Sequence, residues 1–278
     1  MKILAIDTAT DACSAALHLD GGCREIHELA PRRHAEILLP RIRTLLSEAA
    51  LSLRDLDALA FGRGPGAFTG VRIATGVIQG LAFGADLPVV PVSSLHALAQ
   101  GAWRERGEEN ILAAFDARMG EVYWGAYRLD ATGDNEEGTL PCAALPQTTS
   151  TSFDNRQQPF DESLEHNRRG LACAALVPVV RECVCAPGKV PLPQGPLSEG
   201  QSDGWFGVGE GWRTYGEILR REVARRSHGG PPQPVTMEPD RYPHARDIAT
   251  LAIAALDRGE SVAAEHAQPV YLRDRVTR

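Results

Sequence analysis

The chain has 278 residues, of which 43% are apolar, enough for one large or two modest globular domains. Its formal net charge of −7 argues against a protein whose own surface grips nucleic acid, because such surfaces are usually basic. The first residues, MKILAIDTATDACSAAL, are interrupted by Asp7 and do not resemble a secretory leader. No run approaches the roughly 18 apolar residues of a membrane helix. We therefore expect a cytoplasmic protein with no membrane partner.

The amino-terminal residues predict a strand meander followed by a helix. Three short apolar segments, 2–9, 14–20 and 24–30, are separated by turn-like residues and are expected to form antiparallel strands. Residues 34–52 then place apolar side chains on one broad helical face, with Pro40 near the start. This beginning is typical of a mixed sheet with a helix packed against it.

The next segments alternate between strands and helices. We expect a strand over 56–64, a helix over 69–83 capped by Thr69, a strand over 87–94, a helix over 95–106 and a hairpin over 110–129 turning at Arg118–Gly120. The order βββ-α-β-α-β-α-ββ indicates an α/β protein with mixed sheets flanked by helices. Among known architectures it favours the two-lobe actin/hexokinase-like (ASKHA, ribonuclease H-like) fold.

Composition changes in the second half of the chain. Residues 130–203 are rich in Pro, Gly, Ser, Thr, Asn and Gln, although 171–186 are apolar enough for a helix or a strand. Regular structure is expected again over 204–226 and in a helix over 245–259. We therefore expect an amino-terminal lobe, 1–105, and a carboxy-terminal lobe, 106–278, which contains a low-complexity insertion near 134–178.

The stretch GRGPGAFTG, residues 62–70, looks like a phosphate-binding loop but lacks the residues that such a loop needs. It has no Lys followed by Ser or Thr, and its alternating glycines do not match G-x-G-x-x-G. The helix that follows is poor in side-chain bulk at Gly70, Ala74, Gly76 and Gly80, and each interior glycine costs about 0.5–1 kcal/mol. Such a helix packs closely either on the protein's own sheet or on a partner.

Several segments occur together in an order that resembles one known family. They are ILAIDTAT, HAEILLP, GRGPGAFTGVRIATGVIQGLAF, PVSSLHALA, FDARMGEVYWGAY, GVGEGW and AQPVYLRD. Over residues 1–129 and roughly 180–275 the chain resembles the bacterial TsaB (YeaZ) family. Members of that family take part in making N6-threonylcarbamoyladenosine at position 37 of tRNAs that read ANN codons.

The resemblance implies a non-catalytic partner subunit. Such a subunit binds the paralogue TsaD and, with it, the small ATPase TsaE, and it forms a homodimer when TsaD is absent. It needs no cofactor of its own, since ATP and a metal ion are expected on the partner subunits, and it meets tRNA only through the complex. The implied interface is a four-helix bundle formed by the helices over 34–52 and 69–83. Its expected residues are His34, Ile37, Leu38, Leu45, Val71, Ala74, Ile78 and Leu81.

The catalytic paralogue TsaD holds a metal with two histidines four residues apart. At the matching positions this chain has Ser94 and Leu98, and His96 has no histidine at i+4. Leucine cannot ligate a metal and a lone serine is a poor ligand, so we expect no metal site and no catalytic residues. Two alternatives of another class remain open, an ATP-dependent kinase of the same architecture and a metallo-glycoprotease.

A weak anion or nucleotide contact is conceivable at the start of the glycine-rich helix, where helix amides and the dipole favour negative charge. Its residues would be Asp7, Arg63, Thr69 and Arg72. The competing interpretation makes Asp7 a structural turn residue and leaves the arginines in solvent. The six cysteines include no C-x-x-C pair and are expected to be reduced thiols, with Cys183 and Cys185 on opposite faces of a strand.

Overall fold

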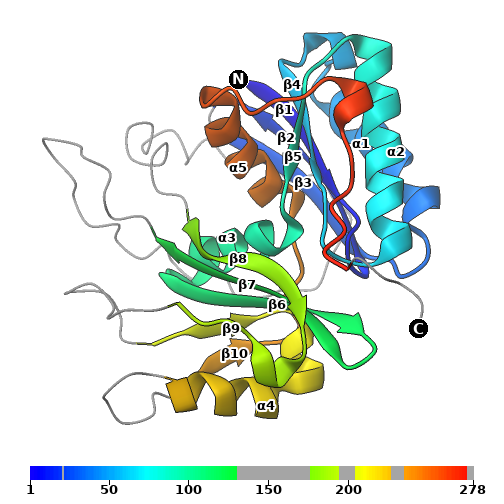
Figure 1. Ribbon diagram of the computed structural model, residues 1–278. Coiled ribbons are helices and arrows are strands. Elements are labelled where there is room, and N and C mark those ends of the chain that lie inside the picture. Colours follow the sequence, from blue (N-terminus) through cyan, green and yellow to red (C-terminus); the bar gives the residue numbers. More distant parts are fainter. Residues whose placement is uncertain (21, 130–175, 194–203, 227–234, 274–278) are drawn as a thin grey trace, which may run out of the picture.

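The computed structural model describes residues 1–20, 22–129, 176–193, 204–226 and 235–273. Two five-stranded mixed sheets, each covered by helices, form two lobes (Figure 1). Most of the predicted insertion near 134–178 lies outside the described residues, and only its last three residues, the start of a strand, are within them. None of the described helices combines the length and apolarity needed to span a membrane.

The first sheet has the strand order β3-β2-β1-β4-β5. Its strands are β1 (Lys2–Asp7), β2 (Ala12–Leu19), β3 (Gly22–Leu29), β4 (Ala58–Gly62) and β5 (Val89–Val92). The first three form the predicted antiparallel meander, whereas β4 and β5 run parallel to β1. The almost wholly apolar sequences of β1 and β4 are explained by their central position, because helices cover both faces of this sheet.

The second sheet repeats this topology. Its strands are β6 (Asn110–Arg118), β7 (Glu121–Leu129), β8 (Leu176–Cys185), β9 (Phe206–Val208) and β10 (Thr236–Glu238). Taken from the β8 edge, their order is β8-β7-β6-β9-β10, again a meander followed by two parallel strands. The fold is therefore duplicated, although the sequence shows no repeat.

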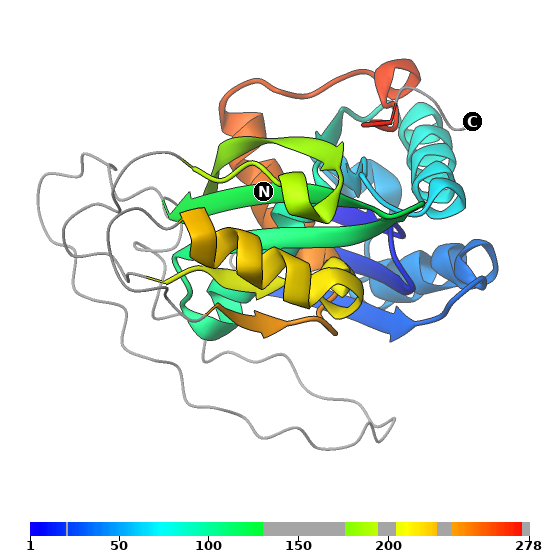
Figure 2. The ribbon, with the colours of Figure 1, turned by 60° about the horizontal axis from the view of Figure 1, so that its bottom comes forward.

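Each sheet is sandwiched between helices. These are α1 (His34–Glu48), α2 (Phe68–Ala85), α3 (Ser94–Arg106), α4 (Glu210–Arg226) and α5 (Ala245–Asp257). Helices α1 and α2 pack on one face of the first sheet, and α5 packs on the other. The second sheet is covered by α3 on one face and by α4 on the other; in Figure 2, α4 is the yellow helix in front of the green strands.

The final helix of each half packs on the sheet of the other half. Helix α3 follows β5 but covers the second sheet, and α5 follows β10 but covers the first sheet. The expectation that everything after residue 105 belongs to the second lobe is therefore wrong for α5. The two crossed helices also contact each other: the Arg104 guanidinium makes two hydrogen bonds, of 2.8 and 2.9 Å, to the Asp247 carboxylate.

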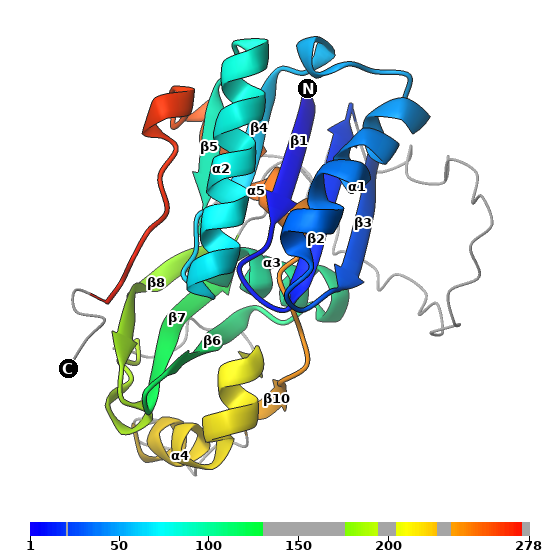
Figure 3. The ribbon, with the colours of Figure 1, turned by 90° about the vertical axis from the view of Figure 1, so that its right-hand side faces the viewer.

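A carboxy-terminal strap, residues 264–273, connects the lobes along the outside (red in Figure 3). The Gln79 side chain donates to the Ala267 carbonyl at 2.7 Å, and the Val270 amide donates to the Arg63 carbonyl at 2.8 Å. Beyond these contacts, the Arg273 guanidinium donates to the Glu121 carboxylate in the hairpin between β6 and β7. The strap therefore ties α2 in the first lobe to the hairpin of the second lobe.

Most element types agree with the sequence-based expectation, and the hairpin turn is confirmed, with positive φ at Arg118, Met119 and Gly120. The segment left open as helix or strand forms β8 over its described part. The predicted cap of α2 is wrong. This helix begins one residue earlier, with Ala67 at the N-cap position and no side-chain cap, so Thr69 lies exposed within the first turn.

Candidate functional site

The glycine-rich stretch, residues 62–70, packs on the end of β1 and the loop that follows it. A Cβ atom at Gly62 would lie 1.7 Å from the Asp7 Oδ2 atom, and one at Gly70 would lie 1.9 Å from the Thr8 carbonyl oxygen. Likewise, a Cβ atom at Gly66 would lie 2.3 Å from the Ala9 carbonyl oxygen. These glycines are therefore required by close packing within the chain; of the helix glycines that the sequence singles out, this holds for Gly70.

Asp7 is used inside this packing. Its side chain is buried, with one carboxylate oxygen accepting from the Ala9 amide at 2.9 Å and the other from the Ser94 hydroxyl at 2.7 Å. Burial raises the pKa of Asp7, although the hydrogen bond from Ser94 opposes this shift. This geometry supports the structural turn role for Asp7, because its carboxyl group is buried and both its oxygens accept hydrogen bonds from the chain itself.

Three glycines farther along α2 lie on the opposite, exposed side of that helix. Gly76, Gly80 and Gly84 are exposed on α2, and beyond the neighbouring turns of the helix no atom of the described residues lies within 4 Å of the Cβ position at any of them. Close packing on the protein's own sheet therefore does not explain these three glycines, which form a bare stripe on the outside of the helix.

The two kinds of glycine predict opposite effects of alanine. Gly80→Ala should raise the free energy of unfolding by about 0.5–1 kcal/mol, because alanine stabilises a helix interior and its methyl group meets nothing. Gly70→Ala should lower it by about 2–3 kcal/mol, because the methyl group would overlap the Thr8 carbonyl. Urea denaturation of both variants measures the difference, and a destabilised Gly80→Ala protein would show that this stripe is packed after all.

The structure places the predicted interface residues mainly in the interior. Leu81 is partly buried, and the other seven are buried in the isolated chain: His34, Ile37, Leu38, Leu45, Val71, Ala74 and Ile78. His34 lies with its Nε2 atom 3.3 Å from the Ala12 carbonyl oxygen. The apolar faces of α1 and α2 are thus buried against the first sheet. A charge introduced at Val71 or Ala74 would destabilise the isolated chain, whether or not a partner binds.

The same two helices have an exposed side that the sequence interpretation missed. Helices α1 and α2 lie side by side in front of the first sheet (Figure 3), and we call their exposed side the outer face. Its principal residues are Leu39, Arg72, Gly76, Gly80, Phe83 and Gly84. The Phe83 side chain is 85% exposed and that of Leu39 is 41% exposed. The sequence signal for this exposed side was the i, i+4 spacing of the glycines, which places them on a different side of the helix from Ala74 and Ile78.

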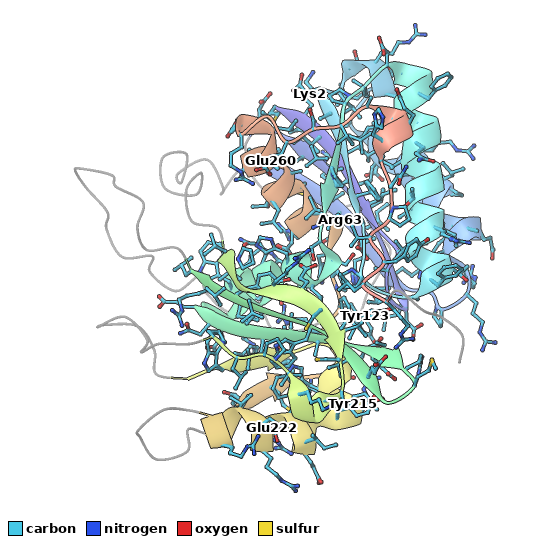
Figure 4. The ribbon with its side chains drawn as sticks, viewed as in Figure 1. Lys2, Arg63, Tyr123, Tyr215, Glu222 and Glu260 are labelled. Atoms are coloured by element: carbon cyan, nitrogen blue, oxygen red, sulfur yellow. The ribbon has the colours of Figure 1, made fainter. Side chains whose placement is uncertain are left out.

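The arginines of the predicted anion contact are not brought together with Asp7. Arg72 is exposed; its guanidinium lies 3.8 Å from the centre of the Phe68 ring and donates to the Tyr271 hydroxyl at 2.9 Å. Arg63 lies between the lobes (Figure 4), where its buried Nε atom has no partner among the described residues. Whether an anion binds near Arg63, Thr69 or Arg72 stays a prediction.

The positions matched to the paralogue's metal ligands are both buried. The Ser94 hydroxyl is engaged by Asp7, and Leu98 is in the core between α3 and the second sheet. Between them, the His96 Nε2 atom lies 2.6 Å from the Leu176 carbonyl oxygen and the ring stacks on Tyr127. In the part of the chain that the structure describes, no three His, Cys, Asp or Glu side chains gather as metal ligands would.

Burial lowers the pKa of His96 to about 4, despite its hydrogen bond to the Leu176 carbonyl. Because the folded state resists this proton while the unfolded state accepts it below about pH 6.5, His96 makes folding less favourable as the pH falls from 6.5 towards 4. In His96→Phe, the loss of stability between pH 7 and pH 4.5 should be smaller by on the order of 2 kcal/mol.

The measurement is urea denaturation at the two pH values, with His266→Phe as the control because His266 is exposed. The absolute stability of His96→Phe can change at both pH values, since the bond to Leu176 is lost, so only the pH difference is diagnostic. An unchanged difference would mean that the His96 ring takes up a proton in the folded protein.

The sequence and the fold of the chain are similar to those of several known proteins. A family model described as "TsaD: tRNA N6-adenosine threonylcarbamoyltransferase" matches residues 25–140. The chain is 38% identical over 276 residues to "tRNA threonylcarbamoyladenosine biosynthesis protein TsaB" of Escherichia coli (strain K12), covering 99% of this chain and 96% of that protein. The Haemophilus influenzae protein of the same name is 34% identical over 277 residues, covering 100% and 95%. A solved structure, "YeaZ from Pseudomonas aeruginosa", is 40% identical with a TM-score of 0.72, covering 98% and 99%.

Proposed function

The chain belongs to the TsaB (YeaZ) family, with its ASKHA-type fold, and we propose that it serves tRNA threonylcarbamoyladenosine biosynthesis as a non-catalytic partner subunit. In this proposal its outer face binds a TsaD homologue, the pair then binds a TsaE homologue, and a second copy of the chain occupies the same face when TsaD is absent. The proposal leaves ATP and the metal ion to the partner subunits, and tRNA contacts the complex rather than this chain alone.

One observation carries the docking proposal: the stripe of Gly76, Gly80 and Gly84 on the outer face. Gly76 and Gly80 lie in the helix interior, where each costs about 0.5–1 kcal/mol, and the described part of the chain recovers none of this by packing, because none of its atoms beyond the neighbouring turns of α2 lies near their Cβ positions. A bare stripe allows the backbone of another helix to approach closely. Phe83 on the same helix and Leu39 on α1 are exposed large apolar side chains that a partner would remove from water.

The interior of the site supports the absence of catalysis by this chain. Leu98 has no atom that can bind a metal, and the hydroxyl of Ser94 is already bonded to Asp7. The loop after β1, where an actin-like kinase would close backbone amides on phosphate, instead has the Ala9 amide bonded to the Asp7 carboxylate. No observation favours the kinase or the metallo-glycoprotease alternative.

Reconstitution tests the proposal. Purified chain is combined with TsaD and TsaE homologues, the remaining pathway proteins, ATP and a tRNA that reads ANN codons, and the modified nucleoside is measured by mass spectrometry. We expect modification only when both this chain and the TsaD homologue are present. Modification by this chain without the TsaD homologue would contradict the proposal, and so would full modification when this chain is left out. Stoichiometric iron or zinc in the purified chain would also contradict it.

A further inference from the structure

The two cysteines of β8 lie close together on one face of their strand. The Sγ atoms of Cys183 and Cys185 are 3.9 Å apart, and a hydrogen bond joins the two thiols. The expectation that they point to opposite faces is wrong, because side chains two positions apart along a strand share a face. Both side chains pack beside the core cluster of Val122, Trp124 and Trp212, and both are only partly buried.

Their position leaves them open to a small reagent. Strand β8 is the last strand of its sheet, so one of its edges has no strand neighbour among the described residues. Strand geometry separates the Cα atoms of residues two apart by about 6.6 Å. A disulfide tolerates Cα separations up to about 6.8 Å but needs its two Cβ atoms within about 4.5 Å, so a bond between the two sulfurs requires this edge strand to bend locally and is strained. Strained disulfides are readily reduced and are typical of reversible sites.

We propose that Cys183 and Cys185 are a thiol pair that a hydroperoxide converts reversibly into an intramolecular disulfide. The Cys183 thiolate attacks one oxygen of hydrogen peroxide, forming an S–O bond and breaking the O–O bond, and the departing hydroxide takes up a proton to become water. The sulfur of Cys185, having lost its proton, then displaces the hydroxyl group of this sulfenic acid, and a second water leaves. Two thiols and one hydrogen peroxide thus yield one disulfide and two waters, and a dithiol reverses the change by exchange.

The surroundings distinguish this pair from the other described thiols. The hydrogen bond between the two thiols lowers the pKa of Cys183, although burial opposes the shift, and Cys183 is therefore assigned as the attacking sulfur. Burial raises the pKa of Cys13 and of Cys23 to about 12, so neither is ionised near neutral pH. Cys13 and Cys23 therefore serve as internal controls in the same molecule.

The sequence permits a direct test on the wild-type protein. Trypsin cleavage after Arg181 and Lys189 releases ECVCAPGK, which contains both Cys183 and Cys185, whereas one peptide, residues 3–24, contains both Cys13 and Cys23. The folded protein is treated with hydrogen peroxide at neutral pH, denatured with N-ethylmaleimide present, digested and analysed by mass spectrometry. We expect the ECVCAPGK peptide to lose two hydrogens and to carry no maleimide, and dithiothreitol added before alkylation should restore two maleimides.

The control peptide should carry two maleimides throughout. In a Cys185→Ser variant, a sulfenic acid should accumulate on Cys183 and be trapped by dimedone, because the resolving thiol is gone. The proposal is overturned if the ECVCAPGK peptide remains fully alkylated after the treatment, if Cys183 or Cys185 is instead linked to another peptide, or if the control peptide is oxidised at the same rate.

Discussion

Replacing Gly80 with arginine should abolish binding of a TsaD homologue, with at least about a 100-fold increase in Kd, while the chain stays folded. Beyond the neighbouring turns of α2, the described residues place no atom within 4 Å of the Cβ position at Gly80, so the arginine extends into solvent in the isolated protein and replaces a helix-interior glycine. In the complex the same side chain would keep the partner's helix away from α2. Isothermal titration calorimetry measures the affinity, and urea denaturation shows whether the variant is at least as stable as the wild type.

The matched control is Gly188→Arg on the second lobe. Gly188 is exposed, and a Cβ atom there would meet only a methyl group of Ile218 at 4.0 Å, so this arginine is also tolerated. It carries the same added charge but lies away from the outer face, and binding should be unchanged. Equal loss of affinity in both variants would point to charge rather than to the outer face, and intact binding by Gly80→Arg would place the docking surface elsewhere.

Asp247→Asn should lower the free energy of unfolding by about 3 kcal/mol. The Asp247 side chain is 1% exposed, and both its oxygens accept hydrogen bonds from Arg104. The neutral amide would keep the shape but lose the charge and one acceptor, so the partly buried guanidinium would keep only its ion pair with the Glu105 carboxylate, at 2.9 Å. Because this ion pair joins α3 to α5, its loss weakens the contact between the two helices that connect the lobes. Chemical denaturation provides the measurement.

Asp257→Asn is the control for this effect. Asp257 lies at the other end of α5 and is exposed, so the same substitution should change stability by less than about 0.5 kcal/mol. A loss at Asp247 no larger than that at Asp257 would mean that the crossing of the two helices does not depend on this ion pair.

The order of elements through residue 129 could be predicted from the sequence because the local signals there are strong. The apolar run of β1, the helical period in α1 and the glycine turn after β6 each depend on near neighbours in the chain. The duplication of the sheet topology could not be predicted, since it requires knowing which strands pair. Nor could the crossing of α3 and α5, because an apolar helix face does not reveal which sheet it covers.

The choice of interface residues failed for a related reason. Apolar side chains on one face of a helix are needed first by the chain's own core, and Leu38 and Ile78 are fully buried there. The more informative residues were those that contradict helical propensity without being buried, namely Gly76, Gly80 and Gly84. By contrast, one of the two interpretations of Asp7 made it a structural turn residue, and the hydrogen bond that its carboxylate accepts from the Ala9 amide agrees with that role.

Hydrogen exchange of the intact chain, with and without a TsaD homologue, tests the central claim most directly. The outer-face proposal predicts that adding the homologue slows exchange in α1 and α2, residues 34–48 and 68–85, and leaves α4, residues 210–226, unchanged. Slowed exchange confined to α4 or to the second sheet, or no change anywhere at saturating homologue, would contradict it.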